Sequence, residues 1–151
     1  MTTTDSSGSS TRIPTATELW FAMNSLVRDH AAESRARIDD RIDMPFSRFR
    51  ALRRIAVRDM TQSDLARRLG IDAPATSVIV NDLVERGLVT RVEHPSDRRF
   101  KVVTITEQGR EVVESVVADQ SAAPDMFAAL DDERRRQLGV LLDTLREAAE
   151  S

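Results

Sequence analysis

Basic side chains gather at one predicted turn of the chain, and their charge suits them to contact a polyanion. Residues 95–99 (PSDRR) combine turn-forming residues with two adjacent arginines. Runs rich in β-branched residues flank this turn at 88–94 and 100–106 and predict a β-hairpin. A basic hairpin tip can enter a DNA minor groove, whose negative potential is strongest where the groove is narrow. The candidate DNA contacts of this hairpin are Arg98, Arg99 and Lys101.

A short amphipathic helix is predicted before the hairpin, and its outer face supplies further candidate contacts. Apolar positions recur at helical spacing at Thr76, Ile79, Val80 and Leu83, so the positions between them face outwards. The major groove admits one α-helix, whose side chains can then reach base edges. Small apolar side chains would touch thymine methyls, Ser77 and Asn81 could hydrogen-bond base edges or phosphates, and Asn suits adenine. The candidate contacts of this helix are Ala73, Pro74, Ala75, Ser77, Val78 and Asn81, with Asp82 at the margin.

Catalytic and metal chemistry find no support among the residues. The two histidines, His30 and His94, are far apart, and no H-x-x-H, H-E-x-x-H, G-x-S-x-G, Walker or G-x-G-x-x-G pattern occurs. The chain has no cysteine, which excludes disulfides, thiolate metal sites and thiol redox sensing. We therefore predict that the protein is not an enzyme and has neither a cofactor nor a metal site. His30 is expected at a helix interface and His94 at a solvated strand end.

Two short predicted helices position the candidate contacts. Thr61 is a good N-cap, with Asp64 three residues later in the capping-box position, and Gly70 ends the first helix. Asp72 can cap the second helix, and Gly87 ends it. Two short helices joined by a glycine-containing turn form a helix-turn-helix, and a hairpin directly after it makes the winged variety.

The stretch 61–106 resembles the multiple-antibiotic-resistance regulators, the MarR family of winged-helix transcription factors. The resemblance extends loosely over about residues 15–150, and the DRR sequence a few residues before T-x-x-G is its most specific part. It implies a homodimer, formed by the N- and C-terminal helices, that binds a pseudo-palindromic double-stranded DNA operator. It also implies a pocket for a small aromatic or phenolic effector between the dimer-forming helices and the winged module. The residues that carry the resemblance are Asp64-Leu65-Ala66, Leu83 to Val89, Asp97-Arg98-Arg99, Ile105-Thr106 and Gly109.

The chain departs from the family pattern on the second helix. Members of the family often carry basic residues at the positions of Val78 and Asp82, and their loss puts more of the binding on the wing. In the family, the aspartate of the wing commonly pairs with one arginine while an arginine reaches the groove. Which of Arg98 and Arg99 takes which role is left open by the sequence.

The remaining segments fit a fold that is mostly α-helical with a small β-hairpin wing. We expect a disordered Ser/Thr-rich tail at 1–12 and a single MarR-like domain at 13–151, with the winged helix-turn-helix at about 46–106. Dimerisation helices are expected at about 15–40, as one long helix from Thr15 to Ile38 that stops at Asp39-Asp40, and at about 107–150. Pro45 opens a helix whose outer face carries arginines, which could follow phosphates or form a salt-bridged surface. After the wing, helices are expected from Glu107 to about Gln120 and from Asp131 or Asp132, the latter with a stripe at Leu138, Leu141, Leu142 and Leu145.

The charge distribution supports a nucleic-acid partner although the net charge is −3. Residues 46–101 hold 12 basic and 7 acidic side chains, a balance of +5, while the rest of the chain holds 10 basic and 18 acidic ones, a balance of −8. A basic module between acidic flanks is typical of a DNA reader with a separate dimerisation part. No secretory signal or membrane span is recognisable, so we expect a cytoplasmic protein.

The sequence therefore predicts a sequence-specific DNA-binding transcriptional regulator, acting as a ligand-responsive repressor. An alternative stays open: a winged-helix module for protein–protein contact without a DNA function, because the outer face of the second helix has little basic character. For the effector pocket the candidate lining residues are Trp20, Met23, Met44 and Phe49, with Arg53 or Arg54 near enough to meet a carboxylate. These side chains could equally be ordinary core, and that alternative also stays open.

Overall fold

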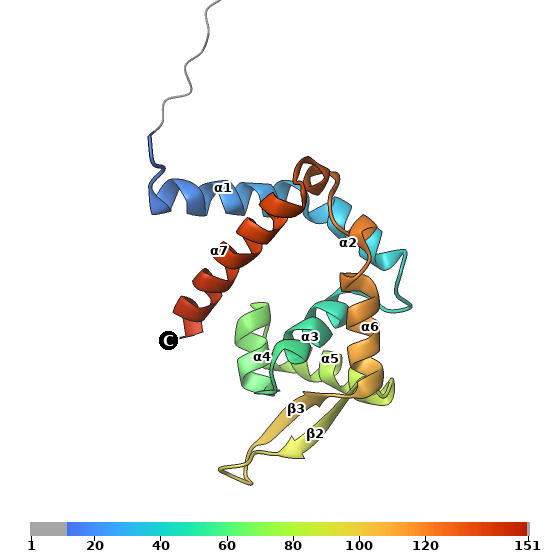
Figure 1. The fold of residues 1–151 in the computed structure, drawn as a ribbon. Helices are drawn as coiled ribbons and strands as arrows, with labels where there is room; N and C mark the ends of the chain where they lie inside the picture. Colours follow the sequence, from blue (N-terminus) through green and yellow to red (C-terminus); the bar gives the residue numbers. More distant parts are fainter. Residues whose placement is uncertain (1–11, 151) are drawn as a thin grey trace, which may run out of the picture. The chain divides into compact units, whose positions relative to one another are not determined.

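The computed structural model describes residues 12–150, which form several helices and a small sheet (Figure 1). The chain divides into two compact units, the first ending at Ala32 and the second beginning at Glu33. Of the predicted tail, residues 1–11 lie outside the described part. The helices are α1 (Ala16–Asp29), α2 (Ala31–Asp39), α3 (Phe46–Val57), α4 (Gln62–Leu69), α5 (Ala73–Glu85), α6 (Glu107–Val117) and α7 (Asp132–Glu150), and the strands are β1 (Met60–Thr61), β2 (Val89–Glu93) and β3 (Lys101–Ile105).

Helix α1 forms most of the described part of the first unit and begins with a complete capping box. The Thr15 hydroxyl accepts from the Glu18 N–H at 3.2 Å, and the Glu18 carboxylate accepts from the Thr15 N–H at 2.7 Å. None of residues 16–29 is buried, and the apolar side chains of the helix are exposed by 38% (Met23) to 69% (Val27). Within its unit, the helix thus leaves its apolar stripe uncovered.

The single long helix predicted from Thr15 to Ile38 is wrong, because the chain leaves the helical conformation at His30. This residue is the C-cap of α1, with φ −105° and ψ 8°, and its N–H points back to the carbonyls of Leu26 and Arg28. The apolar periodicity gave no signal for the break, since such a pattern records only which faces are apolar. The predicted stop at Asp39-Asp40 is confirmed, because α2 ends at Asp39.

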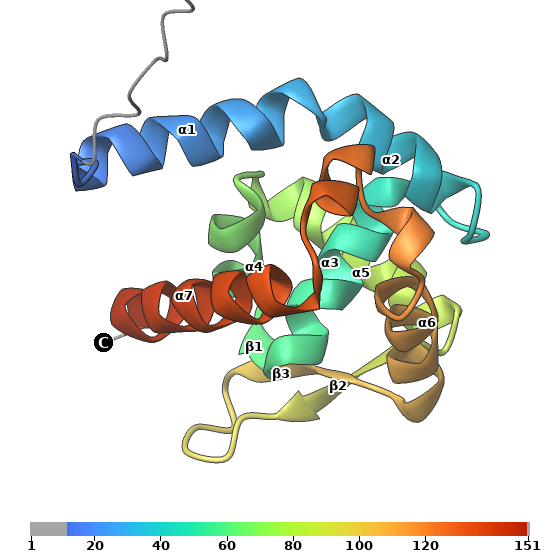
Figure 2. The same cartoon turned by 45° about the horizontal axis from the view of Figure 1, so that its top comes forward.

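The core of the second unit lies where α3, α4, α5 and α6 meet the sheet (Figure 2). Pro45 precedes α3, as predicted, and Leu52 and Ile55 on the inner face of this helix are at most 1% exposed. Leu65 of α4, Leu83 of α5 and Val103 of β3 are buried to the same degree. Burial of each such side chain contributes about 1.5–3 kcal/mol to the free energy of unfolding. The packing of these helices on the sheet therefore stabilises the winged module.

The predicted caps of the helix-turn-helix are confirmed. The Thr61 hydroxyl accepts from the Asp64 N–H at 3.1 Å and lies 2.8 Å from the Asp64 carboxylate, a contact that lowers the pKa of Asp64. Gly70 takes the left-handed conformation, φ +67°, which ends α4. The Asp72 carboxylate then accepts from the Ala75 N–H at 2.7 Å and starts α5.

The sheet is antiparallel in the order β1-β3-β2. β2 and β3 form the predicted hairpin, with Val89 opposite Ile105 and Glu93 opposite Lys101. The short strand β1 was not predicted. It places Met60 opposite Val103, a contact between residues 43 positions apart that local sequence patterns do not encode.

The T-x-x-G sequence at the start of α6 has a packing reason. The Thr106 hydroxyl accepts from the Gly109 N–H at 3.1 Å and donates to the Gly87 carbonyl at 2.7 Å. A Cβ on Gly109 would lie 2.1 Å from the Leu88 carbonyl oxygen. Only glycine therefore allows α6 to pack this closely on the strand entrance.

Helix α6 ends at Val117, earlier than the predicted Gln120, and short 3₁₀ turns follow at Gln120–Ala122 and Asp125–Ala129. The predicted start of the last helix is confirmed: α7 begins at Asp132, and the Asp131 carboxylate accepts from the Arg134 N–H at 2.8 Å. None of residues 132–150 is buried. Among the described helices, none is both long and apolar enough to cross a membrane.

Candidate nucleic-acid interface

Helix α5 buries one face in the module and presents the other to solvent. The predicted buried stripe is confirmed, since Thr76, Ile79, Val80 and Leu83 are its buried residues. Val78 is 59% exposed. The sequence-predicted contacts Ala73, Pro74, Ala75 and Asn81 are also exposed, and Ser77 is half-buried. These six side chains thus lie on or beside the outer face of one helix.

Asp82 is committed to the protein itself. Its carboxylate lies 2.9 Å from Nε of Arg86 and 3.4 Å from Nε of Arg48, and its side chain is 28% exposed. Arg86 also donates to the Asp43 carbonyl at 2.8 Å. The acid therefore balances two arginines and links α5 to α3, so it does not stand as an unpaired negative charge on the outer face.

The wing tip holds two almost fully exposed basic groups. The Arg98 and Arg99 side chains are 91% and 89% exposed. The Asp97 carboxylate accepts from the Arg99 N–H at 3.0 Å and from its Nε at 3.4 Å, whereas Nε of Arg98 lies 3.7 Å from Glu93. Exposed pairs of this kind contribute about 0–1 kcal/mol, so both guanidinium groups can reorient towards a polyanion.

Backbone contacts hold the base of the wing tip. The His94 N–H donates to the Phe100 carbonyl at 2.9 Å, and His94 Nδ1 accepts from the Ser96 N–H at 3.1 Å. His94 thus shapes the turn at the strand end, where the sequence predicted a solvated side chain, with a phosphate contact as the alternative. Lys101 follows as the exposed first residue of β3.

Arg91 was not among the predicted contacts, and the fold brings it to the outer face of α5. One of its terminal nitrogens lies 2.5 Å from Oδ1 of Asn81 and 3.4 Å from Oε1 of Gln62. The sequence did indicate the direction of this side chain, because Arg91 lies two residues after Val89 and therefore on the same face of the strand. Which partners it meets there depends on how α4 and α5 pack on the sheet.

The arginines of α3 divide into two environments. Arg48 belongs to the ion pair with Asp82, and Arg50 donates to the Leu69 carbonyl at 3.5 Å. The pKa of Arg54 is lowered by burial and then by the charges of Arg53, Arg68 and Arg50. Part of this face is thus structural, and the rest is a cluster of like charges on α3 and α4.

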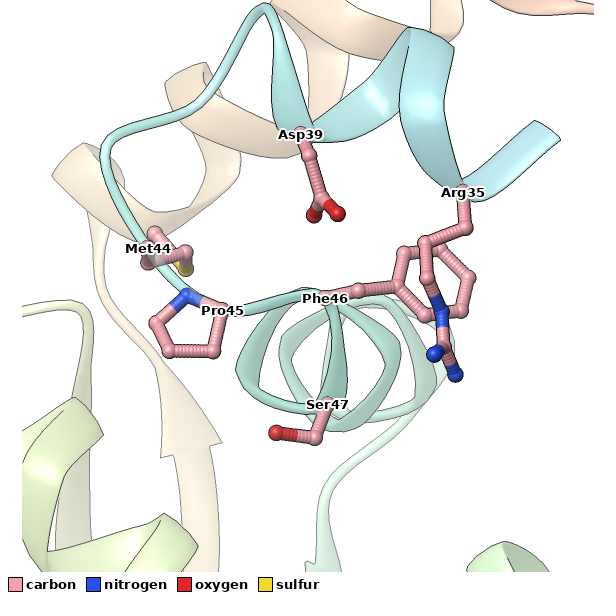
Figure 3. A pocket seen from close by; sticks show the side chains of 6 residues that line it. All are labelled: Arg35, Asp39, Met44, Pro45, Phe46 and Ser47. Atoms are coloured by element: carbon pink, nitrogen blue, oxygen red, sulfur yellow. The ribbon is translucent and has the colours of Figure 1, made fainter. Parts of the chain in front are cut away.

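A shallow hollow of about 340 Å³ lies between the end of α2 and the start of α3 (Figure 3). The Arg35 guanidinium lies 5.3 Å from the centre of the Phe46 ring, within the range of a cation–π contact. The Asp39 side chain points into the space between Met44 and Phe46. The lining residues are Arg35, Asp39, Met44, Pro45, Phe46 and Ser47.

The predicted effector-binding residues are not gathered in this hollow. Met44 lines it, but Phe49 is 2% exposed and belongs to the core, so the neighbouring aromatic ring is that of Phe46. Trp20 and Met23 belong to the first unit and are 62% and 38% exposed. The sequence predicted Phe49 as the aromatic lining residue. Spacing could not distinguish it from Phe46, because both side chains lie on the apolar face of the same helix. Within residues 12–150, no three His, Asp or Glu side chains form a group that could hold a metal ion.

Comparisons with known proteins agree with this geometry. Residues 42–99 match the model of the MarR family. An uncharacterized HTH-type transcriptional regulator of Bacillus subtilis is 34% identical over 89 residues, which is 58% of this chain and 54% of that protein. An uncharacterized protein of Mycobacterium tuberculosis is 31% identical over 70 residues, 46% of this chain and 49% of that protein. The matches thus span about half the length of these curated relatives.

Solved structures extend the likeness in fold to most of the chain. A mutant MepR from S. aureus superposes with a TM-score of 0.73 at 18% identity, covering 91% of this chain and 99% of that one. A mutant MarR from E. coli, complexed with operator DNA, gives a TM-score of 0.58 at 20% identity over 87% of this chain and 99% of that one. Together with the sheet and helix order described above, these likenesses show that the chain has the winged-helix fold of these regulators, and the segment 42–99 is similar to the MarR family.

Proposed function

We propose that this protein is a sequence-specific DNA-binding transcriptional regulator. The observation that carries the proposal is the pair of almost fully exposed arginines, Arg98 and Arg99, at the tip of a hairpin beside the outward face of α5. A DNA complex of a protein with the same fold, MarR of E. coli, supports it. In this reading α5 enters the major groove and the wing arginines enter the neighbouring minor groove.

The wing carries more of the affinity than the helix does. The outer face of α5 offers small, apolar or amide side chains, of which Val78 is 59% exposed, and Asp82 is neutralised by its arginines. Such a face reads shape and methyl groups but attracts few phosphates. Long-range attraction to the polyanion therefore falls to Arg98, Arg99 and Lys101.

The regulator acts as a homodimer on a pseudo-palindromic operator. Helices α1 and α7 bury none of their residues 16–29 and 132–150, and both carry apolar stripes. A second copy is the simplest cover for such stripes, and it would set two α5 helices about 34 Å apart, one turn of duplex. We infer a repressor, since occupancy of an operator by such a dimer blocks access to it.

A small aromatic or phenolic anion is the proposed effector. The hollow beside Met44 and Phe46 offers an apolar wall, and Arg35 offers a positive charge for a carboxylate. Trp20 is the chain's single tryptophan, so its fluorescence reports on α1 without ambiguity. An effector releases DNA only if it binds better to the conformation in which the two α5 helices are wrongly spaced.

The effector proposal is tested by titrating Trp20 fluorescence with salicylate-like phenolic acids while measuring release of DNA in a gel shift. Release with a half-saturation that matches the fluorescence change supports it, and Arg35→Ala should weaken both. Fluorescence quenching without release would mean binding uncoupled from DNA. No response across a broad panel, with DNA binding intact, would indicate a constitutive repressor.

DNA binding itself is tested by fluorescence anisotropy of a labelled nonspecific duplex at increasing salt. Each phosphate contact contributes about 0.9 to the slope of log affinity against log salt. Arg98→Ala and Arg99→Ala should each lower the affinity by about 1–3 kcal/mol and reduce the slope by about one counterion. The double variant should nearly abolish binding.

The matched control replaces Arg134 and Arg136 with alanine. Both are exposed arginines of α7 that pair with neighbouring acids. The control therefore changes the net charge by the same amount but lies outside the proposed DNA-contacting surface. A double wing variant that binds like this control would sink the assignment. The rival function, a protein–protein module that uses the exposed Val78 face, predicts no salt-dependent DNA binding by the wild-type chain.

A further inference from the structure

Arg91 meets the exposed face of α5 from the sheet. It stands directly opposite Val103 in the β2–β3 ladder, and Val103 in turn stands opposite Met60 of β1. Directly opposed residues share one face of a sheet, and Met60 and Val103 are 5% and 1% exposed. The stem of Arg91 therefore continues a buried apolar row, and its charged end emerges beside α4 and α5.

The charged end binds two side-chain oxygens. One terminal nitrogen lies 2.5 Å from Oδ1 of Asn81 on α5 and 3.4 Å from Oε1 of Gln62, the first residue of α4. A guanidinium has donors and no acceptor, so the atom of Asn81 that faces it must be the oxygen. This fixes the orientation of the amide: its oxygen is held by Arg91, and its NH₂ group is left for an external partner.

On the basis of the proposed DNA-binding function, we propose that Arg91 is a positioning residue that sets the base preference of Asn81. Asparagine reads adenine by accepting from N6 and donating to N7 at the same time. Arg91 takes one lone pair of the amide oxygen, and its positive charge disfavours a second donor there, so Asn81 is presented to DNA mainly through its NH₂ group. This NH₂ group suits guanine, which presents two acceptors, O6 and N7, better than adenine, whose single acceptor N7 lies beside an amino group that repels a donor.

The pair therefore changes the expectation for this position from adenine to guanine. The sequence predicts adenine, because asparagine alone has equal access to its two amide ends. In the folded chain, the Arg91 guanidinium binds the amide oxygen and makes it a poorer acceptor for a base. Only Asn81 touches the base in this account, and Arg91 acts through it.

The test selects duplexes from a randomised pool with the full-length protein and then measures the affinity ratio for guanine over adenine at each selected position. The wild-type chain should prefer guanine about tenfold at one position of each half-site. Arg91→Ala releases the amide, so this ratio should fall towards one. Arg91→Lys keeps a donor towards Oδ1 and should retain the preference.

Asn81→Asp provides a variant that keeps the fold even if Arg91→Ala does not. A carboxylate still pairs with Arg91 but has no donor, so the preference should turn from guanine towards cytosine, whose N4 amino group it can accept from. A purely structural Arg91 would lower the affinity for all sequences without changing the ratio. An unchanged ratio in Arg91→Ala, or in Asn81→Asp, would overturn the proposal.

A measurement without DNA separates this proposal from the proposed function. A charged donor on Oδ1 strengthens the C–N bond of the Asn81 amide, so rotation of its NH₂ group, followed by NMR, should be slower in the wild-type chain than in Arg91→Ala. Equal rotation rates would refute the pairing. If the rates differ but the wild-type chain selects no DNA sequence, the pairing stands and the DNA-binding function fails.

Discussion

Helices α6 and α7 are both amphipathic, yet they differ in what covers their apolar stripes. Val113 and Val116 of α6 are 8% and 5% exposed, whereas Leu141 and Leu145 of α7 are 62% and 55% exposed. Each helix also contains one glycine. A Cβ on Gly109 of α6 would meet the Leu88 carbonyl at 2.1 Å, while a Cβ on Gly139 of α7 would meet nothing within 4 Å.

The same sequence pattern, an apolar stripe at helical spacing, therefore serves two purposes in the chain. The stripe of α6 completes the core of the winged module, so its partners are in the same chain. The stripe of α7 has no cover among residues 12–150, so its partner is to be sought outside. Changes to α6 should therefore act on folding, and changes to α7 on assembly.

The largest effect is expected for Gly109→Ala. The new methyl group would clash with backbone at Leu88, which cannot move without breaking the bond from the Thr106 N–H to the Leu88 carbonyl, 3.0 Å long. Overpacking of this kind costs about 3 kcal/mol or more. Urea unfolding followed by circular dichroism should show severe destabilisation or no folded protein. A variant as stable as the wild type would mean that α6 is not packed as described.

The next effect concerns assembly. The proposed dimer should become a monomer at micromolar concentration when truncation after Ala123 removes α7, as measured by sedimentation. Leu141→Lys with Leu145→Lys should do the same without shortening the chain, because charges on the stripe resist burial.

Val140→Lys is the matched control for assembly. Val140 is 66% exposed and lies on the opposite side of α7, so this variant should remain a dimer. A monomeric wild-type protein, or a dimer in the double lysine variant, would refute assembly through α7.

A smaller effect, on the free energy of unfolding, is expected in the connector between α6 and α7. Hydrogen bonds from Ser121 and then from Arg41 lower the pKa of Asp119 to about 2. Since the pKa of an unperturbed aspartate is about 3.9, this group stabilises the fold fully above about pH 4 and loses its effect as the pH falls towards 2. The free energies of unfolding of the wild type and Asp119→Asn should therefore converge over that range.

Ser121→Ala sharpens the same test. It removes the largest cause of the lowered pKa, so the total loss of stability should be smaller and should be complete at a higher pH than in the wild type. Parallel curves for the wild type and Asp119→Asn from pH 4 to pH 2 would show that the connector is not anchored to Arg41.

The smallest effect is expected for Gly139→Ala, the counterpart of Gly109→Ala. The added methyl group meets open space, and alanine is favoured over glycine in a helix by about 1 kcal/mol. The variant should be as stable as the wild type or slightly more so in the same urea experiment. Marked destabilisation would mean that α7 packs against something in the monomer.

Elements whose causes are local could be predicted from the chain's residues. Thr61, Asp72 and Thr106 cap helices by contacts three residues away, and Gly70 ends α4 by its own backbone conformation. The buried stripe of α5 followed from its periodicity, because a helix repeats its faces whatever it packs against. Most of the fold and the position of the wing tip could therefore be predicted.

Contacts between residues distant in the sequence arise only when the elements pack together. Strand β1 forms because Met60 pairs with Val103. The negative charge of Asp82 is balanced because Arg48 of another helix lies within ion-pair distance. Phe46 lines the hollow and Phe49 the core, although both fall on one helix. Arg91 reaches Asn81 because the sheet packs below α5. Periodicity tells which face of an element is buried, but the partner on that face depends on the packing of other elements, which no local pattern specifies.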